Sequence, residues 1–267
     1  MSLLQLGGGT DVRADAPVAR ANPVAKLAVA LLISVMLLLT VDVVTAGTAL
    51  VCELAVLPWC GLSARGLLRR GWIVLAGAIP AGIVTTWLGV DSGAVLLAVG
   101  PVTVTQGSLL AGCAITLRIL SVGLPGVVLL ATTDPTDLAD ALAQVARLPH
   151  RFVLAALAAM RLFALIGTEW QSLGAARRAR GLGDDGVLGR ARTAVGQVLA
   201  LLVLVIRRGT RLSMAMEARG FGLPGRTWAR PSRLRWSDAA VLAGGVVIVT
   251  VATAAGLFAG TWHLALA

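Results

Sequence analysis

The chain has 267 residues, of which 57% are hydrophobic, and its mean hydropathy is +0.87. Soluble domains are much less apolar, so this composition excludes an ordinary soluble enzyme and predicts an integral membrane protein. The net charge of +10 does not indicate a nucleic-acid-binding protein. Such proteins stack bases on aromatic side chains, and this chain has no tyrosine and only four phenylalanines.

Charge-free apolar runs of about 20 residues are long enough to cross roughly 30 Å of hydrocarbon as helices. We predict spans at about 24–41, 43–60, 71–90, 107–131 and 238–260. Pro23 lies near the start of the first span, and Lys26 is expected to extend its ammonium to the interface. Asp42 marks a tight turn into the second span. A Gly/Thr-rich segment without Lys or Arg, at 91–106, separates the third span from the fourth.

The arginines predict the orientation, because short cytoplasmic segments of membrane proteins are enriched in Lys and Arg. The N-terminus and the loop at 61–70 are basic and are placed inside, whereas the turns at Asp42 and Asp91 lack basic residues and are placed outside. Residues 132–236 contain 16 Arg against 7 acidic residues. We therefore expect this region to be cytoplasmic. The predicted domains are a cytoplasmic N-terminal segment (1–23), four spans (24–131), a cytoplasmic coupling domain (132–236) and a C-terminal span (237–267).

Two long helices are expected in the arginine-rich region, at about 150–181 and 191–220, joined by a turn at 183–186. Each contains an apolar stretch, at 152–168 and 195–206, that a hydropathy scan could count as a span. The second stretch is only 12 residues long, and crossing at both would place five arginines outside. We therefore interpret both helices as parts of a cytoplasmic or interfacial domain that pack on one another.

An eleven-residue pattern occurs twice in this region, 39 residues apart. Residues 173–183 and 212–222 share the skeleton L-x-x-A-x-x-A-R-G-[apolar]-G. The Leu and Ala residues lie on one helical face, and a Gly directly after a helix is its usual stop. Each copy is thus a helix that ends by presenting one arginine, and we predict two docking points for partner proteins: Ala179, Arg180, Gly181 and Ala218, Arg219, Gly220. The tripeptide recurs at 64–66 without the longer pattern.

The other arginines of these helices are expected to lie on a solvated face or against lipid headgroups. These are Arg177, Arg178, Arg207, Arg208 and Arg211. Glu53 and Arg118 are the charged residues inside apolar runs, where a charged side chain is costly and faces the protein interior by default. A buried pair between Glu53 and Arg118 is possible, although nothing in the sequence places them together.

No catalytic or cofactor-binding motif is present, so the chain is not expected to be an enzyme or to bind a cofactor or metal itself. A P-loop requires a Gly-rich turn before its lysine, and the only lysine, Lys26, has none. Asp134, Asp137 and Asp140 are spaced by three, which leaves a metal-dependent lipid or headgroup transferase as an alternative. They otherwise mark the acidic start of one amphipathic helix.

These motifs resemble the transmembrane T component of energy-coupling factor (ECF) transporters, the ABC-type importers of vitamins and trace metals. That family has two Ala-Arg-Gly motifs at the ends of its coupling helices, which correspond here to 179–181 and 218–220. Similar stretches are 22–27, at the entry to the first span, and 132–135. Leu148-Pro149, Glu169 and 215–217 also match. The resemblance covers roughly residues 20–230.

The resemblance implies a membrane scaffold that hydrolyses no ATP itself. Two ABC-type ATPases, which bind ATP and Mg, would each receive one of Arg180 and Arg219 in a surface groove. A separate membrane subunit would bind the substrate and topple when the coupling helices are reshaped. Two alternatives remain besides the transferase. A permease subunit of an ordinary ABC transporter has one coupling helix, and a structural protein with a basic apron on anionic lipid would give neither arginine a special role.

Overall fold

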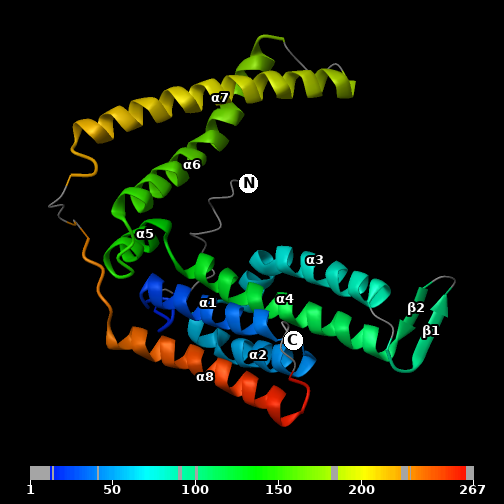
Figure 1. Cartoon of the computed structure of the whole chain (residues 1–267). Helices are drawn as coiled ribbons and strands as arrows, with labels where there is room; N and C mark the ends of the chain where they lie inside the picture. The colour runs from blue at the N-terminus through cyan, green and yellow to red at the C-terminus, as the bar shows by residue number, and fades with distance from the viewer. Residues whose placement is uncertain are drawn as a thin grey trace. The chain divides into compact units, whose positions relative to one another are not determined.

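The computed structural model describes residues 13, 15–40, 42–89, 92–99, 102–181, 186–223, 228 and 230–262. They are almost entirely helical, which confirms the predicted all-α membrane fold (Figure 1). The elements are α1 (Pro23–Leu39), α2 (Val43–Val56), the 3-10 helix η2 (Leu57–Cys60), α3 (Ala64–Leu88), β1 (Val95–Val99), β2 (Val102–Thr105), α4 (Gln106–Thr132), α5 (Pro135–Gln144), α6 (His150–Ala179), α7 (Gly186–Ala218) and α8 (Trp236–Phe258).

The chain divides into two compact units. Residues 142–231 form one unit, which contains α6 and α7, and the described residues of 13–141 and 232–262 form the other. The turn predicted at 183–186 lies almost wholly outside the described residues. Of this segment, only Gly186 is described, as the first residue of α7.

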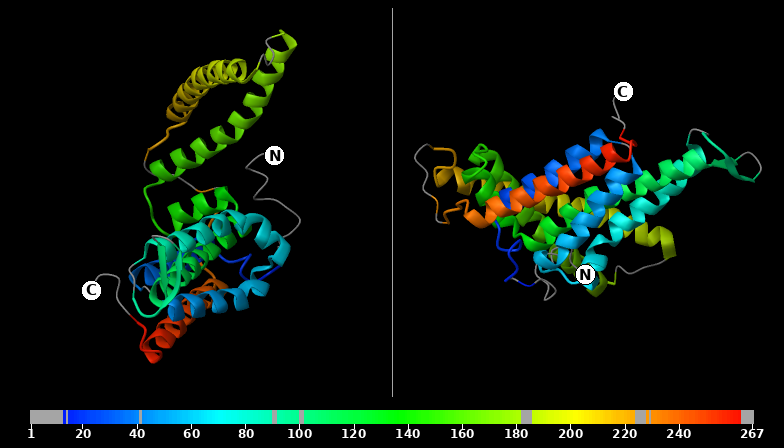
Figure 2. Two further views of the ribbon diagram at one scale, coloured as in Figure 1. Left: turned by 90° about the vertical axis from the view of Figure 1, so that its right-hand side faces the viewer. Right: turned by 90° about the horizontal axis from the view of Figure 1, so that it is seen from below.

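Five helices of the unit formed by residues 13–141 and 232–262 make up an apolar bundle. α1 and α2 each pack against both α4 and α8, and α3 packs along α4. Figure 2 (right) shows α8, in orange, running beside α1, in blue. Small side chains let these helices approach closely, which is how helices associate where lipid is as apolar as they are. The buried centre comes from α1, α2 and α8: Ile33, Leu37, Ala46, Ala49, Ile248 and Ala252.

The third helix begins earlier than predicted. The expected start was residue 71, whereas α3 begins at Ala64. The Ser63 side chain accepts a hydrogen bond from the Gly66 backbone N–H at 3.1 Å and caps the helix there. The arginine-rich loop predicted at 61–70 is therefore mostly helix, because the cap, rather than the end of the apolar run, decides where the helix starts.

The Gly/Thr-rich segment contains a β-hairpin that was not predicted. β1 pairs antiparallel with β2, with Val95 opposite Thr105 and Val99 opposite Val102. Thr105 then caps α4, because its hydroxyl accepts from the Ser108 backbone N–H at 3.2 Å. The alternation of Val and Thr in β2 is the signal that indicates a strand. The turn predicted at Asp91 lies outside the described residues.

Lys26 is buried within the protein, and its predicted position at the membrane interface stays a prediction. Its side chain is 7% exposed, and its Nζ donates to the carbonyl oxygens of Ala19 at 2.8 Å and of Thr132 at 3.1 Å. The hydroxyls of Thr132 and Thr133 lie at 3.2 and 3.5 Å. The Thr132 carbonyl at the end of α4 has no partner within the helix, and its negative partial charge stabilises the buried ammonium. Lys26 thus ties α1 and the N-terminal segment to the end of α4.

The two charged residues within apolar runs have separate partners. The Glu53 carboxylate accepts from the Ser121 hydroxyl at 3.3 Å, and the Arg118 guanidinium donates to the Leu38 carbonyl oxygen at 2.7 Å. The two residues do not form the pair that was considered possible, because each finds a hydrogen-bonding partner on a different neighbouring helix.

Five described helices are long and apolar enough to cross a membrane, in agreement with the predicted number, but one member of the set differs. They are Val43–Cys60, Ala64–Leu88, Gln106–Thr132, His150–Ala179 and Trp236–Phe258. α1, a predicted span, has 17 residues and is slightly shorter than the rest. α6 qualifies by length and composition, whereas the arginines around it predict a cytoplasmic position. The cytoplasmic position of residues 132–236 stays a prediction.

Candidate functional site

Helix α6 ends in the first copy of the repeat. Its last residue is Ala179, and the backbone N–H groups of Arg180 and Gly181 each donate at 3.0 Å to the carbonyl three residues earlier. Gly181 has a φ of +72°, the left-handed conformation that stops helices and that glycine adopts without steric cost. Leu182 and Gly183, which complete the repeat in the sequence, lie outside the described residues.

Helix α7 ends in the second copy with the same geometry. Its last residue is Ala218, and the N–H groups of Arg219 and Gly220 donate to the carbonyl three residues earlier, at 3.1 and 2.9 Å. Gly220 has a φ of +75°, within a few degrees of its counterpart. Each copy of the repeat therefore places one arginine directly after a helix and before a left-handed glycine. The Ala-Arg-Gly at 64–66 lies instead in the first turn of α3.

The two arginines share exposure but differ in surroundings. Arg180 and Arg219 are both exposed. Among the described residues, a Cβ at Gly181 would meet nothing within 4 Å, whereas one at Gly220 would lie 2.9 Å from Leu223 Cδ1. Arg219 also lines a groove between α6 and α7, which Arg180 does not. Arg219 thus lies beside other side chains of its unit, whereas Arg180 does not line this groove.

Two other arginines of this region have partners within the chain, which differs from the solvated or headgroup-bound positions predicted for them. Arg177 donates to the Thr193 carbonyl oxygen on α7 at 2.8 Å. Arg208 on α7 forms an ion pair with Glu169 on α6 at 2.7 Å. Their guanidinium groups reach across the helix pair because α6 and α7 cross, as Figure 1 shows. These contacts were missed, because a single sequence does not show which residues of two helices meet.

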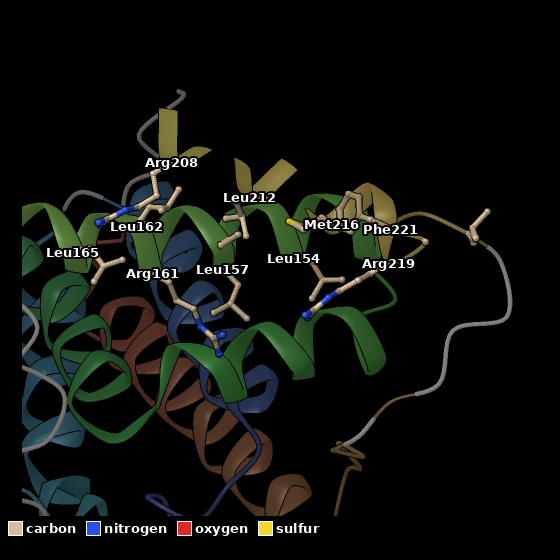
Figure 3. Close-up of a pocket in the computed structure, with 13 residues that line it drawn as sticks. Leu154, Leu157, Arg161, Leu162, Leu165, Arg208, Leu212, Met216, Arg219 and Phe221 are labelled. Atoms are coloured by element: carbon tan, nitrogen blue, oxygen red, sulfur yellow. The ribbon is translucent and has the colours of Figure 1, made fainter. Parts of the chain in front are cut away.

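The groove between α6 and α7 has a volume of about 930 Å³. Figure 3 shows that both helices contribute to its walls and that three arginines stand among the leucines. The arginines are Arg161, Arg208 and Arg219. Apolar lining with a few cations suits an apolar partner that carries acceptor groups. The main apolar lining residues are Leu154, Leu157, Leu162, Leu165, Leu212 and Met216.

The acidic residues that kept a metal-dependent transferase open do not converge. Within the described ranges, no three His, Cys, Asp or Glu side chains are grouped so that they could hold a metal ion. Asp134 instead accepts from the Thr136 backbone N–H at 2.7 Å, as a residue beside a helix start commonly does. The geometry of the described residues therefore gives the transferase alternative no support.

Comparison with known proteins identifies similar chains along nearly the whole length. A family profile described as CbiQ, cobalt transport protein, matches residues 15–228. The energy-coupling factor transporter transmembrane protein EcfT of Heliobacterium modesticaldum is 29% identical over 248 residues, which is 87% of this chain and 91% of that protein. The EcfT of Bacillus subtilis is 28% identical over 70% of this chain and 72% of its own length. EcfT 1 of Listeria monocytogenes is 31% identical over 57% and 60%.

The matched region includes both Ala-Arg-Gly helix ends and most of the apolar bundle. The resemblance seen in the motifs is therefore confirmed over most of the chain. The chain belongs to the CbiQ family, the transmembrane T components of energy-coupling factor transporters.

Proposed function

We propose that this chain is the scaffold on which two ABC-type ATPases and a separate substrate-binding membrane subunit assemble, and that Arg180 and Arg219 are the ATPase docking points. ATP and Mg are bound by the ATPases, where hydrolysis takes place. In this arrangement the N-terminus and residues 132–236 face the cytoplasm, where ATP is available. The chain itself carries out no chemistry and transmits movement.

The observation that carries the proposal is the equal geometry of the two helix ends. Each offers an exposed guanidinium directly after a helix, held by a left-handed glycine. A guanidinium fork binds carboxylates and carbonyls through several hydrogen bonds at once. Two such points on one chain suit two related partners. Helix α7, which precedes Arg219, has 33 residues and is on the order of 50 Å long, more than the width of a small domain.

The length of α6 and α7 and the uncovered apolar surface of α6 support the transmission of movement. The helices α6 and α7 are long single rods, and rigid helices move as units when a partner displaces their ends. No residue of the most apolar stretch of α6 is buried within the described structure. Uncovered apolar surface of this kind is available to lipid or to the substrate-binding subunit.

The test is affinity purification of the tagged chain from its own cells in mild detergent. We expect the unmodified chain to bring down two ABC-type ATPase chains and a multi-span membrane protein. The double variant Arg180→Glu/Arg219→Glu is expected to lose both ATPases and keep the membrane protein. The control, Arg178→Glu/Arg211→Glu, changes the charge equally on the same two helices and at exposed positions. We expect it to retain both ATPases.

Each single charge reversal refines the test. If the two docking points act separately, each single variant removes one of the two ATPase chains from the purified complex. Full retention of both ATPases by the double variant contradicts the assignment of the docking residues. Recovery of the unmodified chain with lipid but without any ATPase contradicts the scaffold function itself.

A further inference from the structure

One ion pair joins the two arginine-rich helices at equivalent positions just before the two copies of the repeat. Arg208 Nη2 lies 2.7 Å from the Glu169 carboxylate, with 40% and 31% of the two side chains exposed. Glu169 precedes Arg180 by eleven residues, and Arg208 precedes Arg219 by the same number. Each residue lies four positions before its copy of the repeat, and the two side chains meet where α6 and α7 cross. The ion pair therefore marks the crossing of the two helices that carry the docking arginines.

The helices are in contact on one side of this ion pair and apart on the other. Toward the connecting turn, Arg177 donates to the Thr193 carbonyl, and a Cβ at Gly196 would lie 3.0 Å from the Arg177 guanidinium. A Cβ at Gly174 would lie 3.1 Å from the Gln197 amide nitrogen.

On the other side of the pair lies the leucine-lined groove of about 930 Å³, whose wall includes Arg208 itself. At its far end Arg151 donates to the Gly222 carbonyl oxygen at 2.7 Å. Glu169 and Arg208 thus stand between a closed part and an open part of the same helix pair. A change in this contact would alter how far the helices diverge along the groove.

An ion pair of this exposure contributes little to the stability of a fold, because water and salt screen it. It is directional, however, and it selects one crossing geometry over others that leave both charges unpaired. A contact of this strength can also break and re-form during a transport cycle.

We propose that the Glu169–Arg208 ion pair is a latch that fixes the crossing of α6 and α7 and so couples the spacing of Arg180 and Arg219 to the width of the groove. Both residues are positioning residues, and neither contacts an ATPase. The inference rests on the proposed docking of ATPases at the two arginines. When the ion pair breaks, a change of distance between the docked ATPases would change the width of the groove.

The first test measures coupling in the whole complex reconstituted in liposomes. Glu169→Gln and Arg208→Gln each remove the ion pair with little change of size, and the swap Glu169→Arg/Arg208→Glu rebuilds it in reverse. We expect each single variant to lower substrate uptake per ATP hydrolysed by about fivefold or more, the low end of typical coupling between sites. ATPase turnover and ATPase co-purification should persist. The swap is expected to restore uptake per ATP.

The matched control is Glu217→Gln on α7. Its carboxylate accepts from the Ser213 hydroxyl on the same helix at 3.5 Å, so its removal leaves the crossing unchanged. We expect normal uptake per ATP. If Glu169→Gln performs like this control, or if the swap stays as uncoupled as the single variants, the latch is refuted. Full retention of both ATPases by Arg180→Glu/Arg219→Glu would refute the docking proposal instead, so the two failures are distinguishable.

The second test measures the crossing directly. Spin labels are attached at Met160→Cys on α6 and Met214→Cys on α7, two exposed positions, with the three native cysteines replaced by serine. We expect a narrow distance distribution in the labelled parent, a broad one with Glu169→Gln and a narrow one in the swap. An unchanged distribution in Glu169→Gln overturns the latch even if transport is impaired.

Discussion

Gly112 on α4 is a position at which one added methyl group should disrupt the bundle. A Cβ there would lie 2.6 Å from the Gly82 carbonyl oxygen of α3 and 2.0 Å from the Thr86 hydroxyl. The converse holds on α3, where a Cβ at Gly82 would lie 2.9 Å from the Gly112 carbonyl. Backbone meets backbone here, so rotation of a side chain cannot relieve the clash in full, and the two helices must move apart.

We expect Gly112→Ala to destabilise the bundle. Overpacking a close contact costs about 1–3 kcal/mol. For a protein of this size each kcal/mol lowers Tm by about 2–4 °C, so the expected fall is about 2–12 °C. The separation of α3 from α4 also weakens the hydrogen bond of the Thr116 hydroxyl to the Ala78 carbonyl, which spans the two helices at 3.5 Å.

The measurement is thermal unfolding of the detergent-solubilised chain, followed by circular dichroism. Gly126→Ala is the control, since it makes the same change in the same helix where a Cβ would meet nothing within 4 Å. Alanine favours a helix over glycine by about 1 kcal/mol, so the control should melt at or slightly above the parent Tm. A Gly112→Ala protein that melts as high as the Gly126→Ala protein would refute the close-approach reasoning.

Two further substitutions test buried polar contacts of the same bundle. Asp238→Ala should lower the free energy of unfolding by about 2–4 kcal/mol, because the carboxylate accepts from the backbone N–H groups of Asn22 at 2.7 Å and Arg235 at 2.6 Å, and both would lose their acceptor. Asp238→Asn should cost less. Urea unfolding compares the two variants, and equal costs would contradict this explanation. Lys26→Met should cost about 1–3 kcal/mol by leaving the Ala19 and Thr132 carbonyls without a donor, and a thermal melt unchanged from the parent would show that these contacts are dispensable.

The sequence by itself determined the membrane class, the positions of most spans and the two arginine-bearing helix ends. These features depend on local chemistry. Long apolar runs form helices in lipid because every backbone polar group must be satisfied within the segment. The Asp42 side chain caps α2 by accepting from the Thr45 N–H at 3.0 Å, and Gly181 and Gly220 stop their helices. The sequence predicts these features because each of the three residues acts on neighbours only a few positions away.

The tertiary structure decided the contacts between residues far apart in the chain. Asp238 accepts from Asn22 across 216 positions, and Glu169 meets Arg208 across 39. Both members of the latter pair lie four residues before a copy of the repeat, but equal spacing does not show that equivalent positions touch. Such pairs form only once helix crossings are set by the packing of whole surfaces, and no local pattern encodes that geometry.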